Sequence, residues 1–263
     1  DIICTDKTGT LTEDRMKVHA ILYGDESVDD AYSIEVSSSV KEHPVFNKMV
    51  LAGVLCNNED PNAIKGQGDS IELSLMEFAK YLGYNPVSIK ENNPELLELP
   101  FDATRKFMAT AHSHGERFHV YTKGAFESLI IHCDFIMNAT GIISFDTKSE
   151  WHAKVNTLAD QGLRTLAFAY KETQKLPTSK SIIEGLTFLG IIGFLDPARN
   201  DVKATIDIYK KAGIKVVMVT GDHPGTSKKI AQEVGLLEMD ASPDKVIIAK
   251  DFVIGDNPDA TVI

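Results

Sequence analysis

An aspartate near the start of the chain is the residue whose neighbours best suit covalent chemistry. Asp6 ends a short apolar run, 1–5, and is followed by Lys7, Thr8 and Gly9. A carboxylate can attack a phosphoryl group if cations neutralise the crowded charge, which Lys7 and a Mg²⁺ ion could do. Oxygen ligands suit Mg²⁺, so Asp6 and Thr8 are the candidate metal ligands. The pattern therefore predicts a phosphoryl-accepting aspartate, although an isolated aspartate can simply cap a turn.

A second group of residues that could assist Asp6 consists of Thr220, Gly221 and Asp222. They follow the apolar run 214–219 and precede an expected helix, so they belong to the turn between a strand and a helix. Ligands bind at the carboxyl ends of the strands in open α/β sheets. Asp6 and Thr220 are therefore expected to converge on one crevice, although most of the chain lies between them.

The elements that must position these residues predict an α/β chain with two domains. The runs 1–5 and 186–194 predict strands, the first of them buried. A helix over 199–212 leads to the strand 214–219, and this strand, helix and strand are expected to form a right-handed parallel unit. The expected segments are 1–16, 17–192 and 193–263, of which the first and last form one Rossmann-like domain and the middle one is an insertion.

The insertion mixes helices with strands that we expect to be antiparallel. Helical patterns are present over 44–57, 71–82 and 151–161, and β-prone runs over 106–113, 116–123 and 165–170. The first two β-prone runs are joined by His114 and Gly115, which predicts a hairpin. His112 and His119 lie in the same hairpin. We interpret these histidines as polar hairpin residues and not as a metal site, because they lack a fixed ligand spacing.

The composition excludes several classes of function. The 263 residues are 43% hydrophobic and 25% charged, which is ordinary for a globular protein. A formal net charge of −11 argues against a nucleic-acid partner, so an anionic ligand needs a local group of cations. No apolar stretch is as long as a membrane span. Cys4, Cys56 and Cys133 are interpreted as reduced thiols in apolar surroundings.

The string D-K-T-G-T-L-T at 6–12 resembles the phosphorylation motif of the P-type ATPases, the ion pumps that form an aspartyl-phosphate during transport. Other strings resemble motifs of the same family in the same order: L-C-N-N at 55–58, G-D-S-I-E at 68–72, P-F-D-A-T-R-K at 100–106, K-G-A-F-E at 123–127, G-L-R-T-L-A at 162–167, L-D-P-A-R at 195–199 and V-T-G-D at 219–222. The resemblance extends from residue 1 to about 237, and it points to the calcium- and sodium-pump-like type. It implies a phosphorylation domain of the haloacid-dehalogenase type with an inserted α+β nucleotide-binding domain, an antiparallel sheet flanked by helices.

The resemblance also implies a role for each motif residue. In the phosphorylation domain Asp6 would be the nucleophile, with Thr8, Thr220 and Gly221 around the transferred group and Lys7 and Asp222 as orienting and neutralising groups. In the inserted domain the ATP-binding residues would be Glu72, Phe101, Lys106, Lys123, Gly124 and Arg164. Phe101 would stack on adenine, Glu72 and Lys123 would line the base pocket, and Lys106 and Arg164 would hold the phosphates.

Two features leave alternatives open. Thr8 stands where soluble phosphatases of the haloacid-dehalogenase type usually carry a second aspartate. Because threonine cannot deprotonate water near neutral pH, a phosphoenzyme should persist, as a pump requires. A soluble phosphatase with a large cap is the rival interpretation. The chain also lacks the family's G-D-G-x-N-D string, which completes the Mg²⁺ site, so the second alternative is a nucleotide-binding piece without turnover.

The resemblance finally predicts the setting of the chain. The expected cofactors are ATP and Mg²⁺, and the expected partners are the transmembrane and actuator domains of a parent pump. The chain itself is expected to be an excised portion at the cytoplasmic face of a membrane. Phe126 stands where the family has proline, and Ser70 and Ile71 replace Pro-Thr, so the shape of the nucleotide pocket is expected to differ in detail.

Overall fold

The computed structural model describes residues 1–34, 39–61, 68–221, 224–242 and 245–247. The chain divides into two compact units. We call Asp1–Asp14 with Pro197–Ile263 the split unit, and Arg15–Asp196 the sheet unit. These bounds lie within a few residues of the expected segments, and the domain identities stay predictions. Among the helices of the described residues, none is long and apolar enough to cross a membrane.

The chain contains both helices and strands. The strands of the sheet unit are β2 (Lys17–Tyr23), β3 (Glu26–Val28), β4 (Glu95–Leu99), β5 (Phe107–His114), β6 (Arg117–Gly124), β7 (Cys133–Asn138), β8 (Gly141–Ser144), β9 (Arg164–Thr173) and β10 (Leu186–Leu195). Its helices are α1 (Pro44–Leu55), α2 (Ser70–Tyr81), α3 (Pro86–Asn92), α4 (Phe126–Leu129) and α5 (Lys148–Asp160). The split unit contains β1 (Ile2–Asp6), α6 (Val202–Lys211), β11 (Lys215–Val219) and α7 (Pro224–Glu233).

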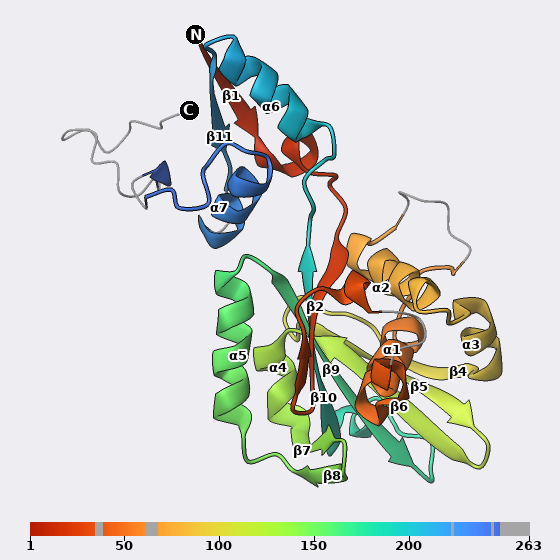
Figure 1. Cartoon of the computed structure of the whole chain (residues 1–263). Coiled ribbons are helices and arrows are strands. Elements are labelled where there is room, and N and C mark those ends of the chain that lie inside the picture. Colours follow the sequence, from red (N-terminus) through yellow and green to blue (C-terminus); the bar gives the residue numbers. More distant parts are fainter. Residues whose placement is uncertain (35–38, 62–67, 222–223, 243–244, 248–263) are drawn as a thin grey trace. The chain divides into compact units, whose positions relative to one another are not determined.

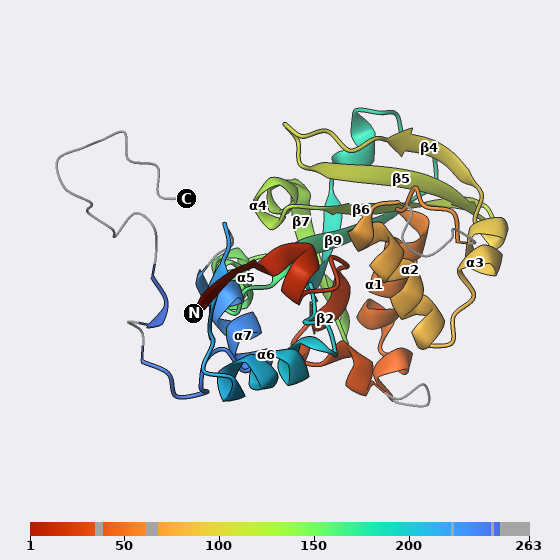
Figure 2. The same cartoon turned by 90° about the horizontal axis from the view of Figure 1, so that it is seen from above.

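Within the described residues, the sheet unit is built on one nine-stranded sheet. Seven of its strands follow the order β3-β2-β10-β9-β6-β5-β4, and each neighbouring pair among them is antiparallel. Strand β7 pairs in parallel with β10 and carries β8 at its other edge. Helices α1, α2 and α3 cover one face of the sheet, and α4 and α5 cover the other (Figures 1 and 2). Each face thus has its own apolar core.

The predicted hairpin and helices of the insertion are confirmed. Strands β5 and β6 pair from Phe107 with Gly124 to His114 with Arg117. Helices α1, α2 and α5 occupy the three stretches with helical spacing. The mixed α/β architecture with an antiparallel sheet is therefore the one expected for this part of the chain.

Strand β10 has a different partner from the one predicted. The sequence pattern placed 186–194 in a parallel unit with 214–219, and this is wrong, because β10 lies inside the sheet of the sheet unit while β11 pairs with β1. All of β10 is buried, since helices cover both faces of the sheet around it. A strand that is buried on both faces has the continuous apolar sequence that is also typical of parallel sheets.

The split unit contains a parallel pair of strands and a small core. Strands β1 and β11 pair from Ile2 with Lys215 to Asp6 with Val219. The expectation that β1 is buried is wrong, because Ile2 is 65% exposed and Cys4 is also exposed. Among the described residues β1 has a single neighbouring strand, which leaves much of it uncovered. The other two cysteines, Cys56 and Cys133, are buried, and all three are free thiols.

The two ends of the sheet unit lie side by side. The backbone N–H of Arg15 donates a hydrogen bond to Oδ1 of Asp196 at 3.1 Å. The Arg15 guanidinium also forms an ion pair with Glu77 of α2. These contacts tie the first and last residues of the unit to its body.

Candidate functional site

The residues expected to bind nucleotide gather at one end of the sheet. The register pairs Phe107 with Gly124 and Gly124 with Ala167, so β5 begins, β6 ends and β9 begins at this end. Arg164, the first residue of β9, pairs with Phe194 near the end of β10. The loop 100–106 joins β4 to β5 at the same place. Three separate segments, the loop 100–106, the end of β6 and the start of β9, therefore bring Phe101, Lys106, Lys123, Gly124 and Arg164 to one end of the sheet.

The loop 100–106 is held by the side chain of Asp102. Its Oδ1 accepts hydrogen bonds from the backbone N–H groups of Thr104 and Arg105, at 2.9 and 3.0 Å. These two donors lower the pKa of the Asp102 carboxyl, because they stabilise its charged form. The turn leaves Phe101 61% exposed just before it and brings Lys106 to the start of β5. An aromatic side chain so exposed is free to stack on a planar ligand.

Gly124 ends β6 where the backbone passes very close to β5. A Cβ atom built on Gly124 would lie 2.2 Å from Cβ of Phe107 and 2.6 Å from the carbonyl oxygen of Lys106. The next residue, Ala125, donates its backbone N–H to that same carbonyl at 2.9 Å. Glycine is required at this position because a side chain would push the loop that carries Lys106 away from β6.

A buried ion pair joins the sheet to helix α2. Nζ of Lys123 lies 2.5 Å from Oε1 of Glu72, and their side chains are 6% and 13% exposed. Glu72 lies in the first turn of α2, whose N-cap is Asp69. The Asp69 side chain accepts the N–H groups of Ile71 and Glu72. Both charges are nearly removed from water, so each depends on the other for compensation.

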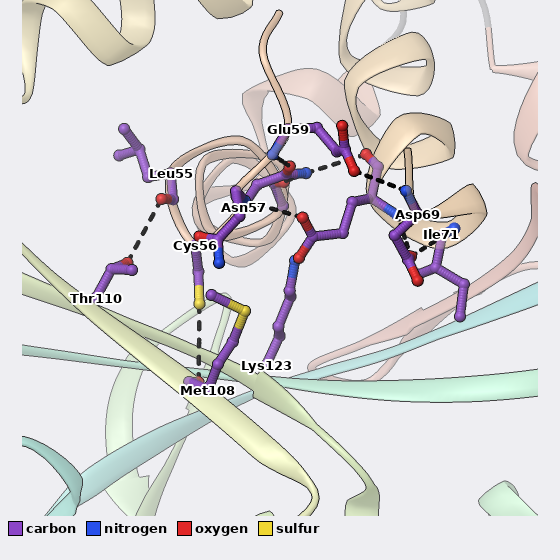
Figure 3. A network of polar contacts seen from close by, with 12 residues as sticks. Leu55, Cys56, Asn57, Glu59, Asp69, Ile71, Met108, Thr110 and Lys123 are labelled. Atoms are coloured by element: carbon purple, nitrogen blue, oxygen red, sulfur yellow. Dashed lines mark hydrogen bonds and ion pairs between the residues drawn. The ribbon is translucent and has the colours of Figure 1, made fainter. Parts of the chain in front are cut away.

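The other carboxylate oxygen of Glu72 is held by the segment that follows α1. Its Oε2 accepts the backbone N–H of Asn58 at 2.9 Å. The buried Asn57 donates its side-chain amide to the carbonyl oxygens of Gly53, at 2.9 Å, and Glu72, at 3.0 Å. Figure 3 shows Lys123 extending from the sheet toward the chain that carries Asn57 and Glu59. Glu72 is thus fixed through both its main chain and its side chain.

Two more cations at this end of the sheet have no ion-pair partner among the described residues. Lys106 and Arg164 are exposed, and neither side chain takes part in a salt bridge within that part of the chain. Side chains at even positions of β9, such as Phe168, lie on the face of the sheet that α1 and α2 cover. Because side chains alternate along a strand, Arg164 belongs to the same face. In a chain with net charge −11, two cations without an ion-pair partner among the described residues, at one end of the sheet, are suited to a polyanion.

In the split unit, Asp6 stands at the carboxyl end of β1. Its Oδ1 accepts the backbone N–H of Lys7 at 2.8 Å, and the side chain is exposed. Lys7 is 4% exposed. Gly9, with a φ of +74°, reverses the chain, and the Thr12 hydroxyl accepts its N–H at 3.3 Å. The turn presents the Asp6 carboxylate with one oxygen still uncommitted to the backbone.

The parallel register brings the second group of candidate residues to the same edge as Asp6. Asp6 pairs with Val219, and Thr220 and Gly221 follow directly. Asp222 lies outside the described residues. The oxygen atoms of Asp6 and Thr8 are the hard donors that Mg²⁺ prefers, and Mg²⁺ commonly keeps several of its waters. Within the described part of the chain, no three His, Cys, Asp or Glu side chains are grouped to hold a metal ion by themselves.

The histidines of the β5–β6 hairpin lie at the opposite end of the sheet and form a polar cluster. His114 and His119 stack with ring centroids 4.4 Å apart, and Nε2 of His119 lies 3.5 Å from Oε2 of Glu172. Lys48 of α1 lies over the ring of Tyr170 in the same cluster. Burial, together with His114 and Lys48, lowers the pKa of His119 to about 4. The ammonium of Lys48 near His119 and the guanidinium of Arg117 on Glu172 disfavour a bound metal cation in this cluster.

The free energy of unfolding is expected to fall as the pH is lowered from about 6.5 toward about 4. The unfolded chain protonates His119 at a higher pH than the folded chain does, so protons favour unfolding in this window and the stability is fully present above it. Burial lowers the pKa of His112 in the same direction. Urea unfolding measured across this window checks the sign, and His119→Gln should reduce the slope without abolishing it. A stability independent of pH would contradict the packing of His119.

Two residues that contact Glu72, near the first end of the sheet described above, do not stand out in the sequence as site residues. Asn57 and Asn58 belong to the string L-C-N-N, which resembles the calcium- and sodium-pump-like type. A signal for Asn57 was present, because an amide that directly follows an apolar helix and is buried with it must find polar partners. The Asn57 amide donates to the carbonyl oxygens of Gly53 on α1 and Glu72 on α2, and the Asn58 amide donates to the carboxylate of Glu98 on β4.

Comparison with known proteins gives one consistent family. A family model described as "P-type ATPase, cytoplasmic domain N" matches residues 45–201. The chain is 33% identical over 240 residues to calcium-transporting ATPase 1 of Bacillus cereus, covering 90% of this chain and 26% of that protein. It is 34% identical over 255 residues to a calcium-transporting ATPase of Bacillus subtilis, covering 90% and 29%, and 32% identical over 267 residues to the human potassium-transporting ATPase alpha chain 2, covering 90% and 25%. The chain therefore spans between a quarter and 29% of the length of these relatives.

Proposed function

Because the chain belongs to the P-type ATPase family, we propose that it is the catalytic portion of an ATP-driven cation pump. The sheet unit binds ATP, and Asp6 of the split unit accepts the γ-phosphoryl group. The resulting aspartyl-phosphate drives transport in the longer protein. The calcium- and sodium-pump-like resemblance of the sequence agrees with the relatives found, which are calcium- and potassium-transporting ATPases.

One observation carries the nucleotide-binding half of the proposal. Phe101, an exposed aromatic, stands at the same end of the sheet as the exposed cations Lys106 and Arg164 and the buried pair of Lys123 and Glu72. The aromatic face suits a purine, the uncompensated cations suit a triphosphate, and the Glu72 carboxylate suits an amino group on the base. Gly124 keeps the backbone of β6 close to the start of β5, beside the loop that carries Lys106.

The phosphoryl-transfer half rests on Asp6. Its carboxylate is exposed at a strand's carboxyl end, where Thr220 and Gly221 also emerge. A carboxylate oxygen attacks the γ-phosphorus in line, the bond from phosphorus to the β-γ bridging oxygen breaks, and ADP leaves. Thr8 and Thr220 contribute hydroxyl donors to the transferred phosphoryl group. Lys7 neutralises part of its negative charge, and Asp222 helps to orient the groups around it. Thr8 supplies no general base, so the phosphoenzyme persists.

Asp6 and Thr8 would hold the Mg²⁺ ion, since both present oxygen donors at one turn. A bound Mg²⁺ supplies positive charge against the crowded phosphate oxygens. The phosphorylation domain is proposed to be of the haloacid-dehalogenase type, a fold that matches the parallel pairing of β1 with β11. The pump interpretation is favoured over a soluble phosphatase by the family, and turnover by this chain without the G-D-G-x-N-D string is not expected.

The setting of the protein follows from the same family. We propose that the chain works at the cytoplasmic face of a membrane, as the description of the matched domain indicates. Its partners would be the transmembrane and actuator domains of the same pump. These parts would lie in the length of the relatives that this chain does not cover.

Titration with ATP tests the nucleotide pocket. We expect amide signals of Phe101, Lys123 and their neighbours to shift in NMR spectra, and Phe101→Ala to weaken ATP binding about tenfold through lost stacking. Because Phe101 is 61% exposed, its removal should leave the free energy of unfolding nearly unchanged. Leu96→Ala is the matched control, since Leu96 is an apolar side chain with 47% exposure on β4. An unchanged spectrum at millimolar ATP would refute the pocket.

A further inference from the structure

The segment after α1 contains a buried amide that is hydrogen-bonded both to its own segment and to Glu72. Asn57 is 2% exposed. Its Nδ2 donates to the carbonyl oxygens of Gly53 and Glu72, and its Oδ1 accepts the N–H of Glu59 at 3.0 Å. One side chain thus joins the end of α1, the first turn of α2 and the turn that follows Asn57. A buried amide with this many partners specifies one local arrangement.

The same turn is fastened from a second side by α3. Nζ of Lys90 donates to the carbonyl oxygens of Asn57, at 2.7 Å, and Glu59, at 2.9 Å. The Glu59 carboxylate accepts the N–H of Asp69, the N-cap of α2, at 2.6 Å. The turn 57–59 therefore cannot move without also disturbing the start of the helix that carries Glu72.

The geometry determines how much of the Glu72 carboxylate is left for a ligand. Each carboxylate oxygen can accept about two hydrogen bonds. Oε1 faces Lys123 and Oε2 accepts the N–H of Asn58, so each oxygen retains one accepting direction. If the turn shifted, Oε2 of Glu72 would lose its hydrogen bond from the N–H of Asn58. The carboxylate would then be free to rotate while it stays paired with Lys123.

We propose that Asn57 is a positioning residue for purine recognition: it holds the turn 57–59 against α2 so that Glu72 presents its carboxylate to an amino group on the base. This inference rests on the proposed nucleotide site. Asn57 itself does not touch the base. Its effect passes through Glu72, so it should influence which base is bound more than how well a phosphate chain is held.

The test compares the dissociation constants of ATP and inosine triphosphate, which carries a carbonyl oxygen in place of the amino group of adenine. In the full chain the wild type should prefer ATP, and Glu72→Gln should reduce the preference about tenfold, the size of one hydrogen bond to a charged group. Asn57→Ala should reduce the ratio by a similar factor. The double variant should show little further loss, because both changes act on the same carboxylate.

Controls separate positioning from loss of structure. Val54→Ala removes buried volume from the same helix, where Val54 is fully buried, and should lower stability while keeping the ATP preference. Lys90→Met loosens the turn from the other side and should reduce the preference by a smaller factor, which keeps the inference testable if Asn57→Ala does not fold. A wild-type ATP preference that survives in Asn57→Ala and Lys90→Met would overturn it. Absence of ATP binding in the wild type would instead refute the nucleotide site.

Discussion

Replacement of Asp6 by asparagine is expected to abolish phosphoenzyme formation in the full-length pump proposed above. The amide is not a nucleophile toward phosphorus, and no hydroxyl of the turn has a base to activate it. Radiolabel from the γ-phosphate of ATP should fall to background in acid-quenched protein. The ATP dissociation constant should change by less than about twofold, a few tenths of a kcal/mol, because the proposed contacts to the base, and those of Lys106 and Arg164 to the phosphates, belong to the sheet unit.

Asp14→Asn is the matched control for this experiment. Asp14 lies in the same unit and has a φ of +53°, a conformation that asparagine tolerates well. The control should retain the label and its release by hydroxylamine. Label that persists in Asp6→Asn would place the phosphoryl acceptor elsewhere. A collapse of ATP affinity in Asp6→Asn would show that the two sites are not separable.

Lys123→Met is expected to cause the largest loss of stability among the site variants. Removing the ammonium leaves the Glu72 carboxylate nearly buried without its counter-charge, which costs about 3 kcal/mol. Nucleotide affinity should fall as well, because Glu72 is then no longer held for the base. Urea unfolding and calorimetric titration measure the two effects separately.

Lys106→Met is expected to lower nucleotide affinity without the loss of stability expected for Lys123→Met. Lys106 is exposed and has no salt bridge within the described residues, so its loss should leave stability within about 0.5 kcal/mol of the wild type and weaken ATP binding through lost phosphate contact. Adding Glu72→Leu to Lys123→Met should recover part of the stability, since an apolar pair needs no compensation. A Lys123→Met variant as stable as the wild type would show that the pair contributes little.

The elements whose apolar residues recur at a regular spacing, or that are joined by typical turn residues, could be predicted from the sequence. Helices α1 and α2 and the hairpin of β5 and β6 have repeats or turn residues that report local structure. Strand β10 could be located but not paired. An uninterrupted apolar run has no polar face, so its sequence does not distinguish a parallel from an antiparallel neighbour.

The sequence indicated which residues belong to the candidate site, but not which of them contact one another. The family resemblance named Glu72 and Lys123, yet neither residue type nor spacing indicated that they form an ion pair across 51 positions. Asn57 was missed as a site residue because its role depends on a contact with Glu72, which is distant in sequence. Side chains that act through hydrogen bonds between distant segments leave no periodic trace in the sequence.

The contact between Arg15 and Asp196 has a consequence for how this architecture can be assembled. In this module Arg15 and Asp196 are hydrogen-bonded and Lys17 pairs with Leu195, so entry and exit lie side by side, and such a module can be inserted into a loop of another domain with little strain on either partner. The same closeness makes it a candidate for independent expression, or for circular permutation with a short peptide bridging residues 15 and 196 and new termini opened at a surface turn. Because its two ends meet, the long insertion 15–196 has the properties of a separable domain.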